Sequence, residues 1–161
     1  MKIEKLFEMQ HGLDRYIEEG HSLAGRDLFD EKVLALLVEI GELANETRCF
    51  KFWSTKGPSE RNIILEEFVD GVHFVLSLGL LTGFDRTKPA VEAVAADQTG
   101  QFLLVMESVH AFQKEKTAKN YQTLMNRYFS LGEMLGFTPD EVEAAYISKN
   151  EVNYERQKSG Y

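Results

Sequence analysis

The stretch "EIGELANETRCFKFWS", from Glu39 to Ser54, places carboxylates three and four residues apart in a run that otherwise has the pattern of a buried helix. At about 100° per residue, Glu39, Glu42 and Glu46 fall on one stripe about 60° wide. The adjoining arc is apolar and contains Val33, Leu36, Leu37, Ile40, Leu43 and Ala44. The acids therefore border the predicted core, where like charges at this spacing repel one another.

A second stretch, "ILEEFVDGVHF" from Ile64 to Phe74, repeats the arrangement with Glu67 and Asp70. Their stripe continues with Ile63 before it and Phe74 after it, which predicts that the two acids are covered. Partly buried carboxylates that lie close together disfavour one another's ionisation, so such a cluster takes up protons or a cation. Carboxylates from two adjacent helices are ligands that Mg²⁺ prefers when it also binds phosphate oxygens. We interpret Glu46 and Glu66 as ordinary surface acids.

Helical periodicity recurs along nearly the whole chain, and the alternation typical of strands is scarce. The predicted helices lie near residues 2–19, 30–49, 60–82, 100–114, 118–135 and 139–158. The last has the clearest start signal, with Thr138 as N-cap, Pro139 at the first helical position and Glu141 completing a capping box. We therefore expect one all-α domain over residues 1–161, built as a bundle of about six helices.

Composition limits the classes of partner. The formal net charge of −8 argues against a nucleic-acid or anionic-membrane surface, because both need a basic patch. No run is long and apolar enough to span a bilayer, and the start "MKIEKLFEMQ" is unlike a signal peptide. The lone Cys49 excludes an intrachain disulfide and a cysteine-based zinc site. We expect a cytoplasmic protein.

The C-terminal helix groups basic residues on one side. Tyr146, Lys149, Asn153, Arg156 and Gly160 fall on a stripe about 80° wide. Lys149 and Arg156 could neutralise phosphate oxygens that a metal ion does not reach. Alternatively, they answer the negative end of the helix dipole at a solvated terminus.

The two acidic stretches resemble the paired-carboxylate motif of the all-α nucleoside triphosphate pyrophosphatase superfamily, which includes MazG-like proteins and dimeric dUTPases. The matching elements are Glu39–Ile–Gly–Glu42 and Glu67–Phe–Val–Asp70. A C-terminal element is similar to one near the end of dimeric dUTPases and comprises Lys149–Asn150, Asn153, Arg156–Gln157 and Gly160–Tyr161. The resemblance covers most of the chain except about residues 84–120, and it implies that the four acids hold magnesium on a triphosphate.

The same resemblance implies a nucleoside pocket. Gln10 matches a glutamine implied in uracil recognition, and His73 matches the family's "D..HF". Trp53 lies in an aromatic segment similar to one in the family, although from the sequence alone a core anchor is the simpler role. Asp14 departs from the pattern, because several relatives have asparagine there, and its role stays open. The substrate-binding residues expected are Gln10, Trp53, His73, Lys149, Asn153, Arg156 and Tyr161.

The resemblance implies hydrolysis of dUTP to dUMP and pyrophosphate by a homodimer, with dUDP as a further candidate substrate. We expect Glu39, Glu42, Glu67 and Asp70 to hold two magnesium ions, with Mn²⁺ able to substitute, and Glu42 or Glu39 to accept the proton of the attacking water. An amide side chain could pair with uracil O4 and N3–H.

Three alternatives stay open. The first is an all-α pyrophosphatase for another nucleoside triphosphate, such as dCTP. The second is a di-iron carboxylate bundle, since Glu107–Ser–Val–His110 and Asp70–Gly–Val–His73 approach the ligand spacing of such sites. The third is a non-catalytic helical interaction module whose acidic helices bind a partner.

Overall fold

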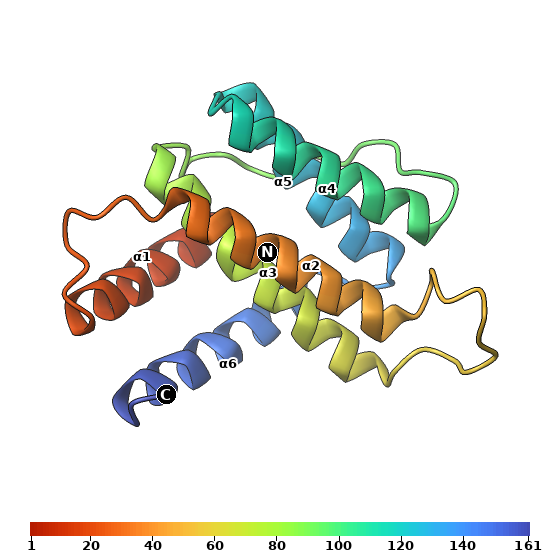
Figure 1. The fold of residues 1–161 in the computed structure, drawn as a ribbon, viewed down its shortest axis with the longest axis horizontal. Coiled ribbons are helices and arrows are strands. Elements are labelled where there is room, and N and C mark those ends of the chain that lie inside the picture. The colour runs from red at the N-terminus through yellow and green to blue at the C-terminus, as the bar shows by residue number, and fades with distance from the viewer.

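The computed structural model describes residues 1–161 as six α-helices with no strand, which confirms the predicted all-α bundle (Figure 1). The helices are α1 Ile3–Gly20, α2 Phe29–Thr47, α3 Arg61–Thr82, α4 Gln98–Lys114, α5 Ala118–Met134 and α6 Pro139–Lys158. None of them combines the length and apolar character needed to cross a lipid bilayer.

Two boundaries differ from the prediction for local reasons. Helix α2 ends at Thr47, two residues early, because Arg48 adopts a left-handed conformation with φ of 58°. Helix α4 begins at Gln98, two residues before the predicted start, because the Asp97 side chain accepts a hydrogen bond from Gly100 N at 2.7 Å. The start of α6 is as predicted.

Helices α2 and α3 form an antiparallel pair at the centre of the molecule (Figure 1). Helices α1 and α6 pack against one side of α3, and the hairpin of α4 and α5 covers the other side of the pair. Fully buried side chains of the central pair include Leu36, Ile40, Leu43, Phe68 and Val72. Acids on the rim of this pair are therefore carried by the most deeply packed elements of the fold.

Two tyrosines of α5 fix the position of α3. The hydroxyl of Tyr128 donates to the Phe68 carbonyl at 2.6 Å, and Tyr121 makes the equivalent contact one heptad earlier. A Cβ at Gly71 would lie 2.7 Å from Tyr128 Cζ and overlap the hydroxyl oxygen, and Gly79 is blocked by Tyr121 in the same way. The two glycines therefore allow the approach that anchors α3.

The start of α6 is tied to the start of α3. Thr138 and Glu141 form the predicted capping box, with Pro139 in the first turn. Arg61 at the start of α3 donates to both carboxylate oxygens of Glu141 at 2.8 Å. It also donates to the Gly136 carbonyl at 2.7 Å. These contacts help to hold α6 in place along α3, so that its later turns face the acidic residues.

Candidate active site

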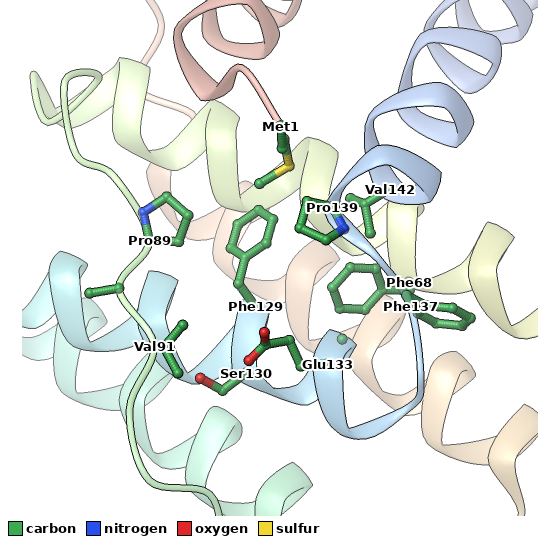
Figure 2. A pocket seen from close by; sticks show the side chains of 12 residues that line it. Met1, Phe68, Pro89, Val91, Phe129, Ser130, Glu133, Phe137, Pro139 and Val142 are labelled. Carbon is green, nitrogen blue, oxygen red and sulfur yellow. The ribbon is translucent and has the colours of Figure 1, made fainter.

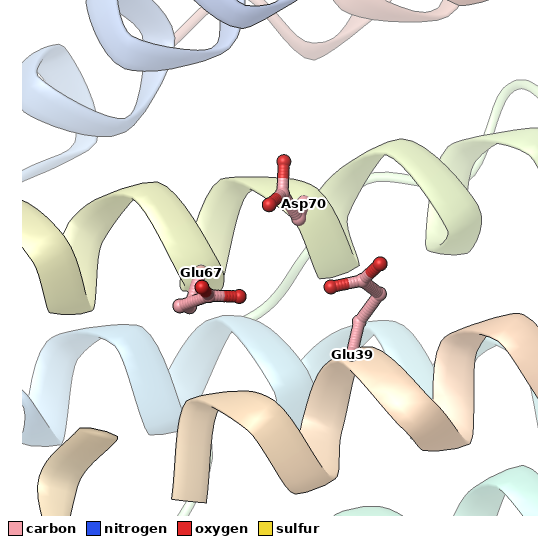
Figure 3. A group of neighbouring side chains, drawn as sticks. All are labelled: Glu39, Glu67 and Asp70. Carbon is pink, nitrogen blue, oxygen red and sulfur yellow. The ribbon is translucent and has the colours of Figure 1, made fainter. Parts of the chain in front are cut away.

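Three acids converge between α2 and α3. Figure 3 shows Glu39 reaching from α2 toward Glu67 and Asp70 of α3, and one oxygen of each lies within 4.8 Å of the others. Glu39 Oε2 and Glu67 Oε2 are buried and have no hydrogen-bond partner. Buried carboxylate oxygens without partners are unfavourable unless a cation or a proton compensates them. The cluster therefore has the chemistry of a cation site.

The pKa values of all three acids are raised, as expected for buried carboxylates that repel one another. Burial raises the pKa of Glu39 to about 8, and the charges of Asp70 and Glu42 add to the shift. Burial, Asp70 and Glu42 likewise raise the pKa of Glu67 to about 7. Burial also raises the pKa of Asp70, although the neighbouring Lys149 acts in the opposite direction. At neutral pH the cluster thus retains protons that a divalent cation can displace.

Glu42 stands at the edge of this cluster. The sequence predicted four converging acids, whereas the structure brings three together and leaves Glu42 exposed outside that group. Its charge still raises the pKa of both Glu39 and Glu67. The predicted cover over the acids is also incomplete, because Ile63 is 39% exposed. Glu42 and the cluster are therefore open to solvent from one side.

Lys149 is buried and points into the acids. Its Nζ lies 3.1 Å from Asp70 Oδ1 and 2.9 Å from Glu66 Oε1. Burial acts to lower the pKa of Lys149, but the hydrogen bond to Glu66 and the charge of Asp70 outweigh it and raise the pKa. The sequence predicted a phosphate contact for Lys149, whereas in the free protein it neutralises Asp70. It also treated Glu66 as a surface acid and missed this pairing, which spans two helices.

A cavity of about 310 Å³ opens beside the acids and collects most of the predicted site. Helices α1, α3 and α6 and the chain's last residue contribute to it, and Glu39 and Asp70 lie along its wall. From the predicted substrate-binding set it is lined by Gln10, His73, Asn153, Arg156 and Tyr161. Residues 63 or more positions apart in the chain thus meet at one cavity.

Gln10 is the centre of a buried hydrogen-bond network in this cavity. Its Oε1 lies 2.7 Å from the donating hydroxyl of Tyr146 and 2.6 Å from His73 Nδ1. Its Nε2 donates to Asp14 Oδ1 at 2.8 Å. The His73 ring stacks on Tyr146 with centroids 4.2 Å apart, and burial lowers the pKa of His73 to about 3, so the imidazole is neutral. The amide that the sequence assigned to the base is thus largely committed to protein partners.

Arg156 is the cation of the site without an acidic partner. Its guanidinium lies over the Tyr161 ring, 4.9 Å from the centroid, and forms no ion pair within the chain. Its charge acts to lower the pKa of Asp70, which places it on the acidic side of the cavity. Arg156 is therefore available to an anionic ligand.

The family model described as dUTPase matches residues 2–161. The chain belongs to the all-α dUTPase family. Membership supports hydrolysis of dUTP, a small nucleotide substrate, and places the chain among nucleoside triphosphate pyrophosphohydrolases. The sequence matches none of the curated proteins with which it was compared.

Trp53 lies apart from the site that the dUTPase family suggests for it. It sits in the loop after α2, is 65% exposed and does not line the cavity. Its ring contacts Phe50 and Phe52 edge-on, with centroids 6.0 and 5.1 Å away. The alternative role as a core anchor is wrong, because the side chain is exposed.

The ligands of the di-iron alternative are not brought together, in agreement with the dUTPase family. Glu107 pairs with Arg127 at 3.7 Å, and His110 is exposed on α4. His73 uses Nδ1 to contact Gln10, and neither histidine belongs to the converging acidic group. The acids therefore form an all-oxygen site.

A second cavity of about 150 Å³ is mostly apolar and lies between α3, α5 and the start of α6 (Figure 2). Phe68, Phe129 and Phe137 form much of its wall. Its polar side chains are Ser130 and Glu133, and none of the converging acids lines it. It has one carboxylate, Glu133, and no lysine or arginine, so it lacks the group of acids and the cations that a metal-bound triphosphate requires.

Proposed function

We propose that this protein hydrolyses dUTP to dUMP and pyrophosphate in a Mg²⁺-dependent reaction. The observation that carries the proposal is the pair of buried, partnerless oxygens of Glu39 and Glu67 beside a nucleoside-sized cavity. The family match supports the same substrate. We retain two metal ions per site, with Mn²⁺ as a substitute, as part of the proposal.

The donor set fits magnesium. Glu39, Glu67 and Asp70 offer only carboxylate oxygens, the hard ligands that Mg²⁺ prefers, and the open side toward Glu42 leaves room for water and phosphate. When bound, magnesium supplies charge that offsets the triphosphate and lowers the pKa of a coordinated water. Glu39, Glu67 and Asp70 would hold it, with Glu42 at the rim.

The other residues bind the triphosphate and move the proton. Arg156, which has no acidic partner, would grip phosphate oxygens through its planar guanidinium. In the free protein Lys149 pairs with Asp70. When a metal ion binds Asp70 instead, the Lys149 ammonium group would be released to pair with phosphate oxygens. Glu42 is exposed at the edge of the cluster and is our candidate to accept the proton of the attacking water, with Glu39 as the alternative.

The nucleoside would occupy the part of the cavity lined by α1, α3 and α6. Leu13, Ile17 and Phe74 provide apolar walls for the base, and Gln10 and His73 provide polar groups. Asn153 and Tyr161 also line the cavity and are candidates to contact the sugar or the first phosphate. In this proposal one cavity holds the nucleoside, and the acids along its wall face the phosphates.

We also propose a homodimer in the cytoplasm. Leu34 and Val38 on α2 and Leu103 on α4 are 63%, 50% and 63% exposed, and Phe52 in the loop is 93% exposed. Apolar exposure on this scale favours an interface. In such a dimer Trp53 of one copy could reach the cavity of the other, which is the sense in which we keep Trp53 as a substrate-binding residue.

Pyrophosphate release from dUTP with and without Mg²⁺ tests the proposal. We expect turnover only with the metal, and much faster release from dUTP than from dCTP, dTTP or UTP. A dUDP assay and the iron content of the protein complete the comparison. Glu39→Gln should abolish turnover, whereas Glu31→Gln on the exposed start of α2 should not. Equal rates on all four triphosphates would overturn the uracil assignment, and turnover in chelator would overturn the metal assignment.

A further inference from the structure

The mostly apolar cavity between α3, α5 and the start of α6 is separate from the acidic site and has no part in the proposed function (Figure 2). Its volume is about 150 Å³. An apolar cavity of this size has room for one six-membered ring. Phe68 and Phe137, which form part of its wall, are buried side chains. The cavity therefore reaches into the core of the fold.

Packing fixes the aromatic wall of this cavity. The Phe68 ring stacks on Tyr128 with centroids 4.8 Å apart, and its centroid lies 5.7 Å from that of Phe137. Phe129 meets the Phe68 ring edge-on, with centroids 6.3 Å apart. A Cβ at Gly132 would lie 2.5 Å from Phe68 Cζ, so the glycine allows that ring to lie against α5. A ligand would thus enter a preformed site.

Ser130 gives the cavity a buried polar group. The residue is only 2% exposed and lies within α5, yet the structure gives its hydroxyl no hydrogen bond within the chain. On the same helix, Thr123 donates its hydroxyl to the Lys119 carbonyl at 3.1 Å. The Ser130 side chain lines the cavity instead (Figure 2). A buried hydroxyl without a partner is unfavourable, so the cavity favours a ligand that satisfies it.

Glu133 adds a negative charge to the same part of the cavity. It follows that serine by three residues on α5, and this spacing places the two side chains on one face of the helix (Figure 2). No lysine or arginine lines the cavity. Two nearby cations pair with other acids, Arg61 with Glu141 at 2.8 Å and the Met1 amino group with Glu143 at 3.9 Å. The Glu133 carboxylate is thus left for a cation from outside the chain.

We propose that this cavity binds a small aromatic amine, with its ring among the three phenylalanines and its ammonium group at Ser130 and Glu133. Aromatic walls favour an aromatic ligand and attract a cation over their faces. The ammonium group supplies hydrogen-bond donors for the hydroxyl and the carboxylate, and its charge complements that of Glu133. A plain hydrocarbon ring would leave both polar groups without partners, and an anionic ligand would be repelled.

Three single-ring probes test the assignment on the full chain at neutral pH: benzylamine, toluene and benzoate. Binding is followed by NMR through the methyl groups of Met1, Val91 and Val142, which line the cavity. We expect benzylamine and toluene to shift these signals and benzoate to leave them in place. The methyl groups of Val38, which is exposed on α2 outside the cavity, should not move with any probe.

Two substitutions then test the polar contacts. Ser130→Ala should weaken benzylamine binding about fivefold, the effect of losing one hydrogen bond. Glu133→Gln should weaken it about two- to fivefold, because this carboxylate is exposed, and added salt should reduce the difference. Toluene makes neither contact, so its affinity should be unchanged, which also shows that the cavity of each variant is intact. Asp140→Asn is the matched control, because it removes an exposed acid that does not line the cavity.

A wild-type protein whose cavity signals do not respond to benzylamine would overturn the proposal. Benzoate binding as tightly as benzylamine would do the same, since the carboxylate would then select nothing. If both polar variants kept the full benzylamine affinity, or if Asp140→Asn weakened it as much as Glu133→Gln, the amine would not be held at Ser130 and Glu133. None of these measurements uses nucleotide hydrolysis, so they stand whether or not the proposed function holds.

Discussion

The two faces of α3 differ in how completely their polar groups are satisfied. The face toward α5 is close-packed, and Tyr128 fits over Gly71 with its hydroxyl bonded to a backbone carbonyl. The face toward α2 carries Glu67 and Asp70 beside Glu39, with bare buried oxygens and raised pKa values. Close packing on the face toward α5 stabilises the folded protein. Repulsion between the acids on the face toward α2 destabilises it.

The largest expected effect follows from removing an acid. Glu67→Gln should lower dUTP turnover by roughly 10²–10³-fold, the scale of losing one group that stabilises charge in the transition state. The thermal midpoint of the metal-free protein should stay or rise, because the substitution removes a repulsive charge. Steady-state pyrophosphate release and thermal unfolding in chelator measure the two effects. A variant that lost stability together with activity would show that Glu67 belongs to the packed face instead.

The packed face is tested by two glycine-to-alanine substitutions. Gly71→Ala should destabilise the protein by about 2–3 kcal/mol, because its Cβ overlaps the buried hydroxyl of Tyr128. Gly41→Ala, in the middle of α2, meets no atom within 4 Å and should stabilise by about 0.5–1 kcal/mol through helix propensity. Urea unfolding measures both. If both variants changed the free energy of unfolding by the same amount, the contact between Tyr128 and Gly71 would not restrict the side chain at position 71.

The acids of α2 and α3 make the stability of the protein depend on pH. Without metal, stability should fall as the pH rises, whereas the stabilisation by magnesium should increase. Glu39 and Glu67 have folded pKa values of about 8 and about 7, raised above the ordinary 4.5, so the folded state binds protons more tightly than the unfolded state. Their contribution to stability is full below pH 4.5 and is lost as the pH rises through about 7 to 8. Magnesium replaces those protons. The rise in thermal midpoint that it produces should therefore grow from about pH 6 to about pH 8.5.

One substitution distinguishes the pH dependence caused by the acidic cluster from that caused by other titratable groups. Glu39→Gln should flatten the metal-free pH profile in the same range. His73 does not interfere there, because its pKa is lowered to about 3, and the stability it contributes is lost only as the pH falls below the ordinary value of 6.5. A magnesium-induced shift that is constant over pH would contradict proton displacement from the cluster.

The sequence predicted which residues share a face of one helix, because helical periodicity decides that. It did not predict contacts between different helices, which form only when the helices pack. The spacing of Glu39, Glu67 and Asp70 placed them on the inner rims of two helices, because a helix fixes which residues share a face. Nothing in that spacing showed that Lys149 would pair with Asp70. Two of the three partners of Gln10 are 63 and 136 residues away, so its full network exists only after α1, α3 and α6 have assembled.

The role of Trp53, in the loop after α2, is a second feature that the sequence could not predict. A tryptophan between helices can be a core anchor, a ligand wall or an interface residue, and composition does not distinguish these roles. The structure removes the first, because Trp53 is 65% exposed. The side chain contacts Phe50 and Phe52 but no part of the cavity of its own chain, and its proposed role depends on a second copy.

The smallest expected effect on stability is that of Trp53→Ala, which should change the free energy of unfolding by about 0.5 kcal/mol or less, since the side chain is exposed. In the proposed homodimer it should nevertheless raise KM for dUTP, as measured by steady-state kinetics. Phe52→Ala in the same loop serves as the control for the loop's fold. Mixing Trp53→Ala with Glu67→Gln after partial unfolding then distinguishes a site shared by two chains from one built by a single chain. Recovery of activity would require one site to take its acids from the first chain and its tryptophan from the second. Activity that stays at the level of the separate variants, together with an unchanged KM, would remove Trp53 from the site.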